Sequence, residues 1–228
     1  MNTSEPILDF PPRKPPERRI FTGQYVALEP ASEDRHSNDL FAAATAKNGD
    51  RIWDYLPYGP FGTQAEMAKR VALCEASVDP QYMTLRRLDT GRCSGMATFM
   101  RIDPAMGVVE IGHIWMAPEL QRTRAATEAI FLMMDHVMTD LKYRRLEWKC
   151  NAANGASQNA ARRFGFTFEG IFRQHMIVKG HNRDTAWFSI IDSEWPALRE
   201  KFIAWLAPEN FDTEGRQRTQ LATGERQA

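Results

Sequence analysis

The sequence predicts a mixed α/β domain, in which a mainly antiparallel sheet of about seven strands has helices on both faces. Three observations lead to this fold class. Short β-rich segments are separated by turn residues, and longer segments carry apolar residues at helical spacing. The two kinds of segment alternate along the chain in the order βααβββαβαββ, followed by a last helix.

Each expected strand is a short run rich in β-branched and aromatic residues. In the first strand, Ala27 and Glu29 alternate with Val26 and Leu28 across the two faces. The expected strands cover residues 20–29, 81–87, 95–102, 108–116, 145–150, 166–178 and 185–192. Hairpin turns are expected at residues 89–91, 103–107 and 179–182.

The expected helices combine apolar periodicity with start and stop signals. Ser32 and Thr63 are expected N-caps, and Thr63 with Glu66 forms a plausible capping box. Gly165 is a natural stop for the helix before it. The expected helices cover residues 32–46, 63–77, 123–141, 153–164 and 195–206.

The two ends of the chain differ in composition from the middle. Residues 1–19 are rich in proline and are expected to form an extended arm. Residues 20–206 form the expected single domain, and residues 207–228 form a polar tail.

Composition narrows the range of functions. Lys+Arg and Asp+Glu number 29 each, which argues against a global electrostatic surface for nucleic acid or membrane. No apolar run has the roughly 18 residues needed to span a bilayer, and the start of the chain lacks a signal-peptide pattern. The expected location is therefore the cytoplasm. Cys74, Cys93 and Cys150 show no paired spacing and the histidines lie far apart, so neither a disulfide framework nor a metal site is expected.

The junction between the expected strand 108–116 and the helix beginning near Thr123 is a candidate anion site. The start of a helix presents unpaired N–H groups and the positive end of the helix dipole. Arg122 and Arg124 add two guanidinium groups, which match phosphate geometry. The alternative interpretation is an ordinary loop with two solvated arginines, because phosphate-binding turns are usually richer in glycine.

The order of elements, with this turn after the fourth strand, resembles the GNAT superfamily of N-acetyltransferases. Several segments resemble its ribosomal-protein N-acetyltransferase branch, which uses acetyl-CoA as co-substrate. The similar segments are residues 110–118, 121–129, 149–157, 160–166, 168–173 and 192–196. Together they extend over roughly residues 20 to 206.

The resemblance implies a set of acetyl-CoA-binding residues. They are Ile114, Trp115 and Met116 on the fourth strand, Gln121, Arg122, Thr123, Arg124, Ala125, Ala126 and Thr127 on the turn and helix, and Asn154 after the fifth strand. The family turn usually carries glycine where this chain has Arg124, and often where it has Arg122. We expect an arginine there to keep a helix-like backbone and to direct its side chain out of the turn, toward a phosphate of CoA. For Asn154 the alternative is a simple helix cap.

Three residues are candidates for catalysis. Glu110 and His113 are possible general bases on the fourth strand, and His113 has the more suitable intrinsic pKa. Strand alternation predicts that they lie on opposite faces, so that at most one reaches the substrate cleft. Glu147 on the next strand, or a water chain, is a further possibility. Many relatives use a tyrosine as acid where this chain has Ala161, and Ser157 is the candidate donor in its place.

The aromatic loop between the first two helices is the candidate acceptor wall, since this region walls the acceptor cleft in the family. Trp53, Tyr55 and Tyr58 are its candidate substrate contacts, with minor-core packing as the alternative. The leading hypothesis is transfer of an acetyl group to a primary amine of a small molecule or a protein N-terminus, by a monomer or a homodimer. Transfer of a larger acyl group and a non-catalytic acyl-CoA sensor are the alternatives.

Overall fold

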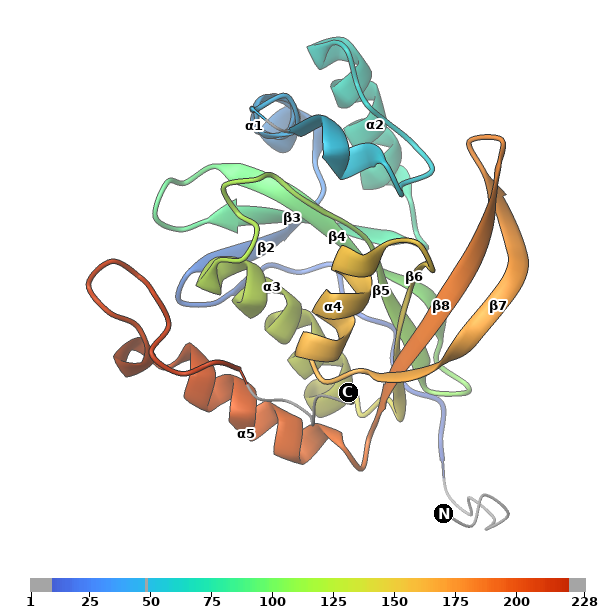
Figure 1. Cartoon of the computed structure of the whole chain (residues 1–228), viewed down its shortest axis with the longest axis vertical. Helices are drawn as coiled ribbons and strands as arrows, with labels where there is room; N and C mark the ends of the chain where they lie inside the picture. The colour runs from blue at the N-terminus through green and yellow to red at the C-terminus, as the bar shows by residue number, and fades with distance from the viewer. Residues whose placement is uncertain (1–9, 48, 222–228) are drawn as a thin grey trace.

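The structure, a computed structural model, describes residues 10–47 and 49–221. Within these residues, eight strands form one sheet in the order β1-β2-β3-β4-β5-β6-β8-β7 (Figure 1). All neighbouring strands are antiparallel except β5 and β6, which are parallel. The predicted mixed, mainly antiparallel sheet is therefore confirmed. The strands are β1 (Phe21–Thr22), β2 (Val26–Pro30), β3 (Gln81–Arg87), β4 (Cys93–Asp103), β5 (Val108–Met116), β6 (Arg145–Asn151), β7 (Thr167–Val178) and β8 (His181–Ile191).

The first predicted strand, 20–29, is divided into the two short strands β1 and β2. A tight turn at Gly23 separates them, with Phe21 paired to Leu28. The Glu128 carboxylate causes the break, because it accepts hydrogen bonds from the N–H groups of three turn residues (Gln24 at 2.8 Å, Tyr25 at 2.7 Å and Val26 at 3.0 Å). A Cβ atom at Gly23 would lie 2.4 Å from the Glu128 carboxyl carbon, so only glycine fits.

The helices of the described residues agree closely with the predicted ones. They are α1 (Glu33–Ala44), α2 (Gln64–Ala76), α3 (Arg124–Asp135), α4 (Gly155–Arg163) and α5 (Trp195–Leu206), with a π-helical turn (His136–Asp140) prolonging α3 and short 3₁₀ turns at Gly49–Trp53 and Pro208–Asn210. Thr63 caps α2 by accepting from the Glu66 N–H at 3.2 Å. Ser32 precedes α1 without a side-chain cap, and its own N–H donates to His36 Nδ1 instead.

The sheet separates two apolar clusters, and the helices divide between them (Figure 1). Leu40 of α1 and Val71 of α2 pack with Trp115 on one face. Ile130 of α3, Phe164 of α4 and Phe202 of α5 are buried on the other face. Both faces of the sheet are therefore covered, as the sequence predicts.

Segments from both ends of the chain contact this domain. Residues 10–20 have no regular secondary structure, and the Arg13 N–H donates to the Pro104 carbonyl. Beyond α5, Phe211 and Leu221 are buried, so residues 207–221 pack back onto the domain although their composition is polar. The outermost residues of the predicted arm and tail, 1–9 and 222–228, lie outside the described residues. Nowhere in the described chain does a helix have the length and apolarity needed to cross a bilayer.

Candidate active site

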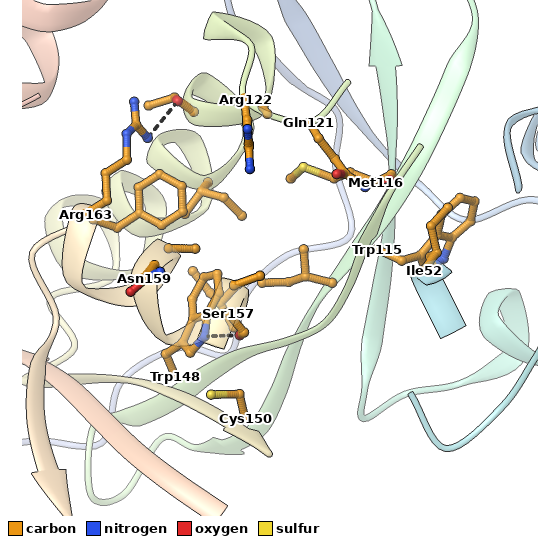
Figure 2. A pocket seen from close by; sticks show the side chains of 18 of the residues that line it. Ile52, Trp115, Met116, Gln121, Arg122, Trp148, Cys150, Ser157, Asn159 and Arg163 are labelled. Carbon is orange, nitrogen blue, oxygen red and sulfur yellow. Dashed lines mark hydrogen bonds between the residues drawn. The ribbon is translucent and has the colours of Figure 1, made fainter. Parts of the chain in front are cut away.

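A gap in the sheet between β5 and β6 forms the centre of the site. The two strands pair only where Val108–Glu110 faces Arg145–Glu147, although β5 continues to Met116 and β6 to Asn151. Past Glu110 the facing edges of the two strands have no sheet partner in each other. A cleft of about 1900 Å³ lies along this gap, lined also by the starts of α3 and α4 and by the loop at 51–57. Figure 2 shows one end of this cleft.

The start of α3 is the anion-binding end of the cleft. Thr123 caps the helix by accepting from the Ala126 N–H at 3.1 Å. The N–H groups of Arg122, Arg124 and Ala125 have no acceptor among the described residues, and all three residues line the cleft. Gln121 donates to the Met116 carbonyl at 2.8 Å and ties this turn to the end of β5. Free amides at the positive end of a helix dipole suit a phosphate group.

The two arginines of the turn have different roles. Arg122 has φ of +62°, so the expected helix-like backbone is wrong at this position, and the residue keeps the left-handed conformation that glycine favours. Its side chain extends into the cleft (Figure 2). Arg124 is the first residue of α3, and its guanidinium carbon lies 4.2 Å from the Tyr25 ring centre and 5.3 Å from that of Phe211. Of the two, only Arg124 has the helical backbone that the sequence predicted.

A third arginine at this end, Arg163 of α4, was not predicted as a site residue. It donates to Thr127 Oγ1 at 3.1 Å and lines the cleft beside the α3 start (Figure 2). The signal available in the sequence was its place in segment 160–166, which resembles the family.

A β-bulge in β5 overturns the prediction that Glu110 and His113 lie on opposite faces. Thr98 pairs with Gly112, whereas Met96 pairs with Trp115, so β5 has one extra residue between the two pairs. His113 takes up this residue with φ of +47°. Because an extra residue inverts the alternation, both Glu110 and His113 line the cleft.

Glu110 is a buried carboxylate among cations. It is 4 % exposed, and its carboxylate lies 3.0 Å from Lys149 Nζ and 3.4 Å from Arg101 Nε. Burial raises the pKa of Glu110 above its usual value, against the opposing effects of Lys149 and Arg101. Glu147 contacts Lys149 at 2.5 Å and Arg145 at 2.8 Å. It is not among the residues lining the cleft.

His113 is held neutral in the cleft wall. Its ring stacks on that of Tyr58, with 5.5 Å between the ring centres. Burial lowers the pKa of His113 to about 4, and the positive charges of Arg70 and Arg183 lower it further. Of the two candidate bases, Glu110 therefore has its pKa moved toward neutrality and His113 away from it. No group of three potential metal ligands occurs within residues 10–47 and 49–221.

The comparison with protein families decides what kind of protein this is. The family model described as an acetyltransferase (GNAT) domain matches residues 26–167. The chain belongs to the GNAT family. The predicted resemblance is thereby confirmed.

Several GNAT relatives are similar to the chain over most of its length. The crystal structure of a GCN5-related N-acetyltransferase from Brucella melitensis is 50% identical with a TM-score of 0.92, covering 93% of this chain and 96% of that one. YdaF of Bacillus subtilis (strain 168) is 26% identical over 173 residues, which are 74% of this chain and 90% of that protein. The ribosomal-protein-serine acetyltransferase of Escherichia coli (strain K12) is 30% identical over 101 residues, which are 44% of this chain and 56% of that protein.

At the start of α4 in this GNAT chain, Ser157 and Asn154 both line the cleft. Ser157 Oγ accepts a hydrogen bond from the indole N–H of Trp148 at 3.0 Å (Figure 2). An indole only donates, so the Ser157 hydroxyl keeps its own proton available for donation. Asn154 Oδ1 caps α4 by accepting from the Ser157 N–H at 3.0 Å. The capping alternative is therefore correct for this oxygen.

The aromatic loop of this GNAT chain contributes mainly to packing. Trp53 is 2 % exposed and its ring lies 5.2 Å from that of Trp115. Tyr58 stacks on His113 on one side and on the guanidinium of Arg70 on the other. Of the three aromatic residues predicted as substrate contacts, only Tyr55 lines the cleft, and its hydroxyl donates to the Ala153 carbonyl at 3.1 Å.

Proposed function

We propose that this GNAT chain is an acetyl-CoA-dependent N-acetyltransferase that acetylates a primary amine, either of a small molecule or of a protein N-terminus. The observation that carries the proposal is a single cleft along the β5–β6 gap. It has free helix amides at one end and a carboxylate with a neutral imidazole further along. The name of the Escherichia coli relative, a ribosomal-protein-serine acetyltransferase, supports an amine acceptor.

The residues present fit acetyl-CoA. The free N–H groups of Arg122, Arg124 and Ala125, with the Arg122 side chain, suit a pyrophosphate. The unpaired edge of β5 at Ile114 and Met116 offers backbone groups to the amides of a pantetheine arm. When bound, acetyl-CoA supplies an activated thioester carbonyl.

The direction of the N–H groups in β5 selects the oxyanion donor. The Ala117 N–H donates to the Ser94 carbonyl, on the β4 side. Because N–H groups alternate in direction along a strand, the Met116 N–H points to the gap and the Trp115 N–H points to β4. We therefore assign oxyanion stabilisation to Met116 rather than to Trp115.

Glu110 and Ser157 have the properties of the base and the acid. An amine attacks only in its neutral form, and a base is most effective when its pKa lies near the working pH. Burial moves the pKa of Glu110 in that direction. His113 then serves as a neutral hydrogen-bonding group beside it. Ser157, whose hydroxyl proton is free to donate, protonates the leaving thiolate directly or through water.

The test uses the full chain with acetyl-CoA and a panel of primary amines, following thiol release, while calorimetry measures CoA binding. We expect Glu110→Gln to lower kcat by about 10²- to 10⁴-fold with little change in CoA affinity. Glu119→Gln, which alters an exposed carboxylate outside the cleft, is the matched control. Tight CoA binding without thiol release from any amine would instead identify an acyl-CoA sensor. Turnover only with longer acyl-CoA thioesters would identify transfer of a larger group.

A further inference from the structure

Arg183 of β8 is an arginine without a partner in the wall of the cleft. Its side chain lines the cleft, and its Nε atom is shielded from solvent without a hydrogen-bond partner. Within the described part of the chain, no carboxylate forms an ion pair with it. Burial lowers the pKa of Arg183, the direction expected for a desolvated cation that lacks an anion.

Other partly buried arginines of this protein are paired with carboxylates. Arg145 contacts Glu147 at 2.8 Å and Glu169 at 2.6 Å, and Arg86 contacts Glu29 at 2.6 Å. Removing a charge from water is unfavourable unless it is paired, so a partly buried arginine without an anion is costly to the fold. The exception in the cleft wall indicates that an external anion binds there.

The surroundings of Arg183 are positively charged as a whole. It interacts electrostatically with Arg101, Glu110 and His113, which places it at the same end of the cleft as the candidate base. Here Glu110 is already in contact with both Lys149 and Arg101, and His113 is neutral. Three cations therefore face one carboxylate, and an acceptor carrying only a positive charge would be repelled.

We propose that Arg183 binds a carboxylate of the acceptor, so that the substrate class is an amine with a carboxylate close to the amino group. Two sources share this chemistry: a free α-amino acid, and a protein N-terminus with an acidic side chain next to the first residue. The inference rests on the proposed N-acetyltransferase function. The same positive surroundings favour the neutral form of the acceptor amine, which is the reactive form.

The experiment compares acceptors that differ only in the carboxylate. One arm uses L-leucine and L-leucinamide, and the other uses Ser-Asp-Gly amide and Ser-Asn-Gly amide. For the arm that matches the natural source, we expect the wild-type chain to favour the carboxylate by about 10- to 100-fold in kcat/KM, as for a hydrogen bond to a charged group. Arg183→Gln should bring this ratio close to 1 while changing kcat/KM for the neutral acceptor less than about threefold. Comparing variant with wild type cancels the intrinsic difference between the two amines.

Arg173→Gln is the matched control, since Arg173 is an exposed arginine of the adjacent strand β7 and does not line the cleft. It should leave both ratios unchanged. The proposal is overturned if the wild type shows no preference in either arm, or if Arg183→Gln lowers both members of a pair equally. If no amine is acetylated, the proposed function fails, and calorimetry with N-acetyl-leucine against N-acetyl-leucinamide still decides the carboxylate site. Binding of the acid alone, lost in Arg183→Gln, supports the site, and equal binding of both refutes it.

Discussion

Replacing Arg122 and Arg124 by glycine, one at a time, tests the different roles that the structure gives to these neighbours. At Arg122, φ of +62° is costly for any residue with a Cβ, by roughly 1–2 kcal/mol. Glycine removes that cost but adds about 0.4–1 kcal/mol of unfolded-state entropy. Arg122→Gly should therefore leave stability unchanged or increase it by up to about 1.5 kcal/mol.

At Arg124 the same substitution should destabilise the protein. The guanidinium stacks over Tyr25 and Phe211, which contributes about 0.5–1 kcal/mol at a partly exposed site. Glycine in a helix costs about 1 kcal/mol more than a good helix former. The expected loss is about 1–2 kcal/mol, or several degrees in Tm for a chain of this size.

Urea unfolding of both variants measures the difference directly. Lys142→Gly is the matched control, because Lys142 is exposed and also has positive φ, of 58°. It should behave like Arg122→Gly. CoA affinity should fall about 2- to 5-fold in Arg122→Gly, since one exposed charge is lost while the backbone N–H groups remain. Equal destabilisation by the two arginine variants would show that Arg122 does not have the left-handed conformation.

Three further predictions concern single buried contacts. Ser157→Ala removes the acceptor of the Trp148 indole N–H and should cost about 1–3 kcal/mol in urea unfolding as well as lowering kcat, whereas Asn159→Ala, also in the cleft, should do neither. Glu128→Gln cannot accept from all three N–H groups of the β1–β2 turn and should cost about 3 kcal/mol; a change below 0.5 kcal/mol would contradict the account of that turn. His113 has a folded-state pKa of about 4 against 6.5 when unfolded, so it reduces stability as the pH falls from about 6.5 to 4, by up to roughly 3 kcal/mol. Unfolding measured at pH 7 and pH 4.5 should show a smaller pH dependence in His113→Gln, and an unchanged dependence would show that His113 titrates normally.

The order and type of the elements were predictable because their signals are local. The Thr63 cap of α2 and the glycine after α4 act within a few residues of where they stand. The division of the first strand was not predictable in this way. It depends on Glu128, about a hundred residues further along the chain, whose carboxylate meets the turn only after α3 has packed on the sheet.

The site was predictable in its location but not in its details. The strand-turn-helix junction marked the anion-binding end, because helix N-termini have the same chemistry in every fold. The sequence did not reveal that Arg122 would take a glycine-like conformation, while Arg124 would pack against Tyr25 and Phe211. Nor could composition show that Arg183 would lack a carboxylate partner, since ion pairing is decided by which strands become neighbours.

The β5 bulge explains why alternation failed where it mattered most. Without the extra residue, His113 would face the α3 side of the sheet and Trp115 would leave the cluster that it forms with Trp53. With it, Glu110 and His113 share the cleft while Trp115 still packs against the aromatic loop. A one-residue irregularity thus satisfies two demands that a regular strand cannot meet together. It lies on the strand whose edge separates from β6, so the same residues that open the gap also bring the candidate base to it.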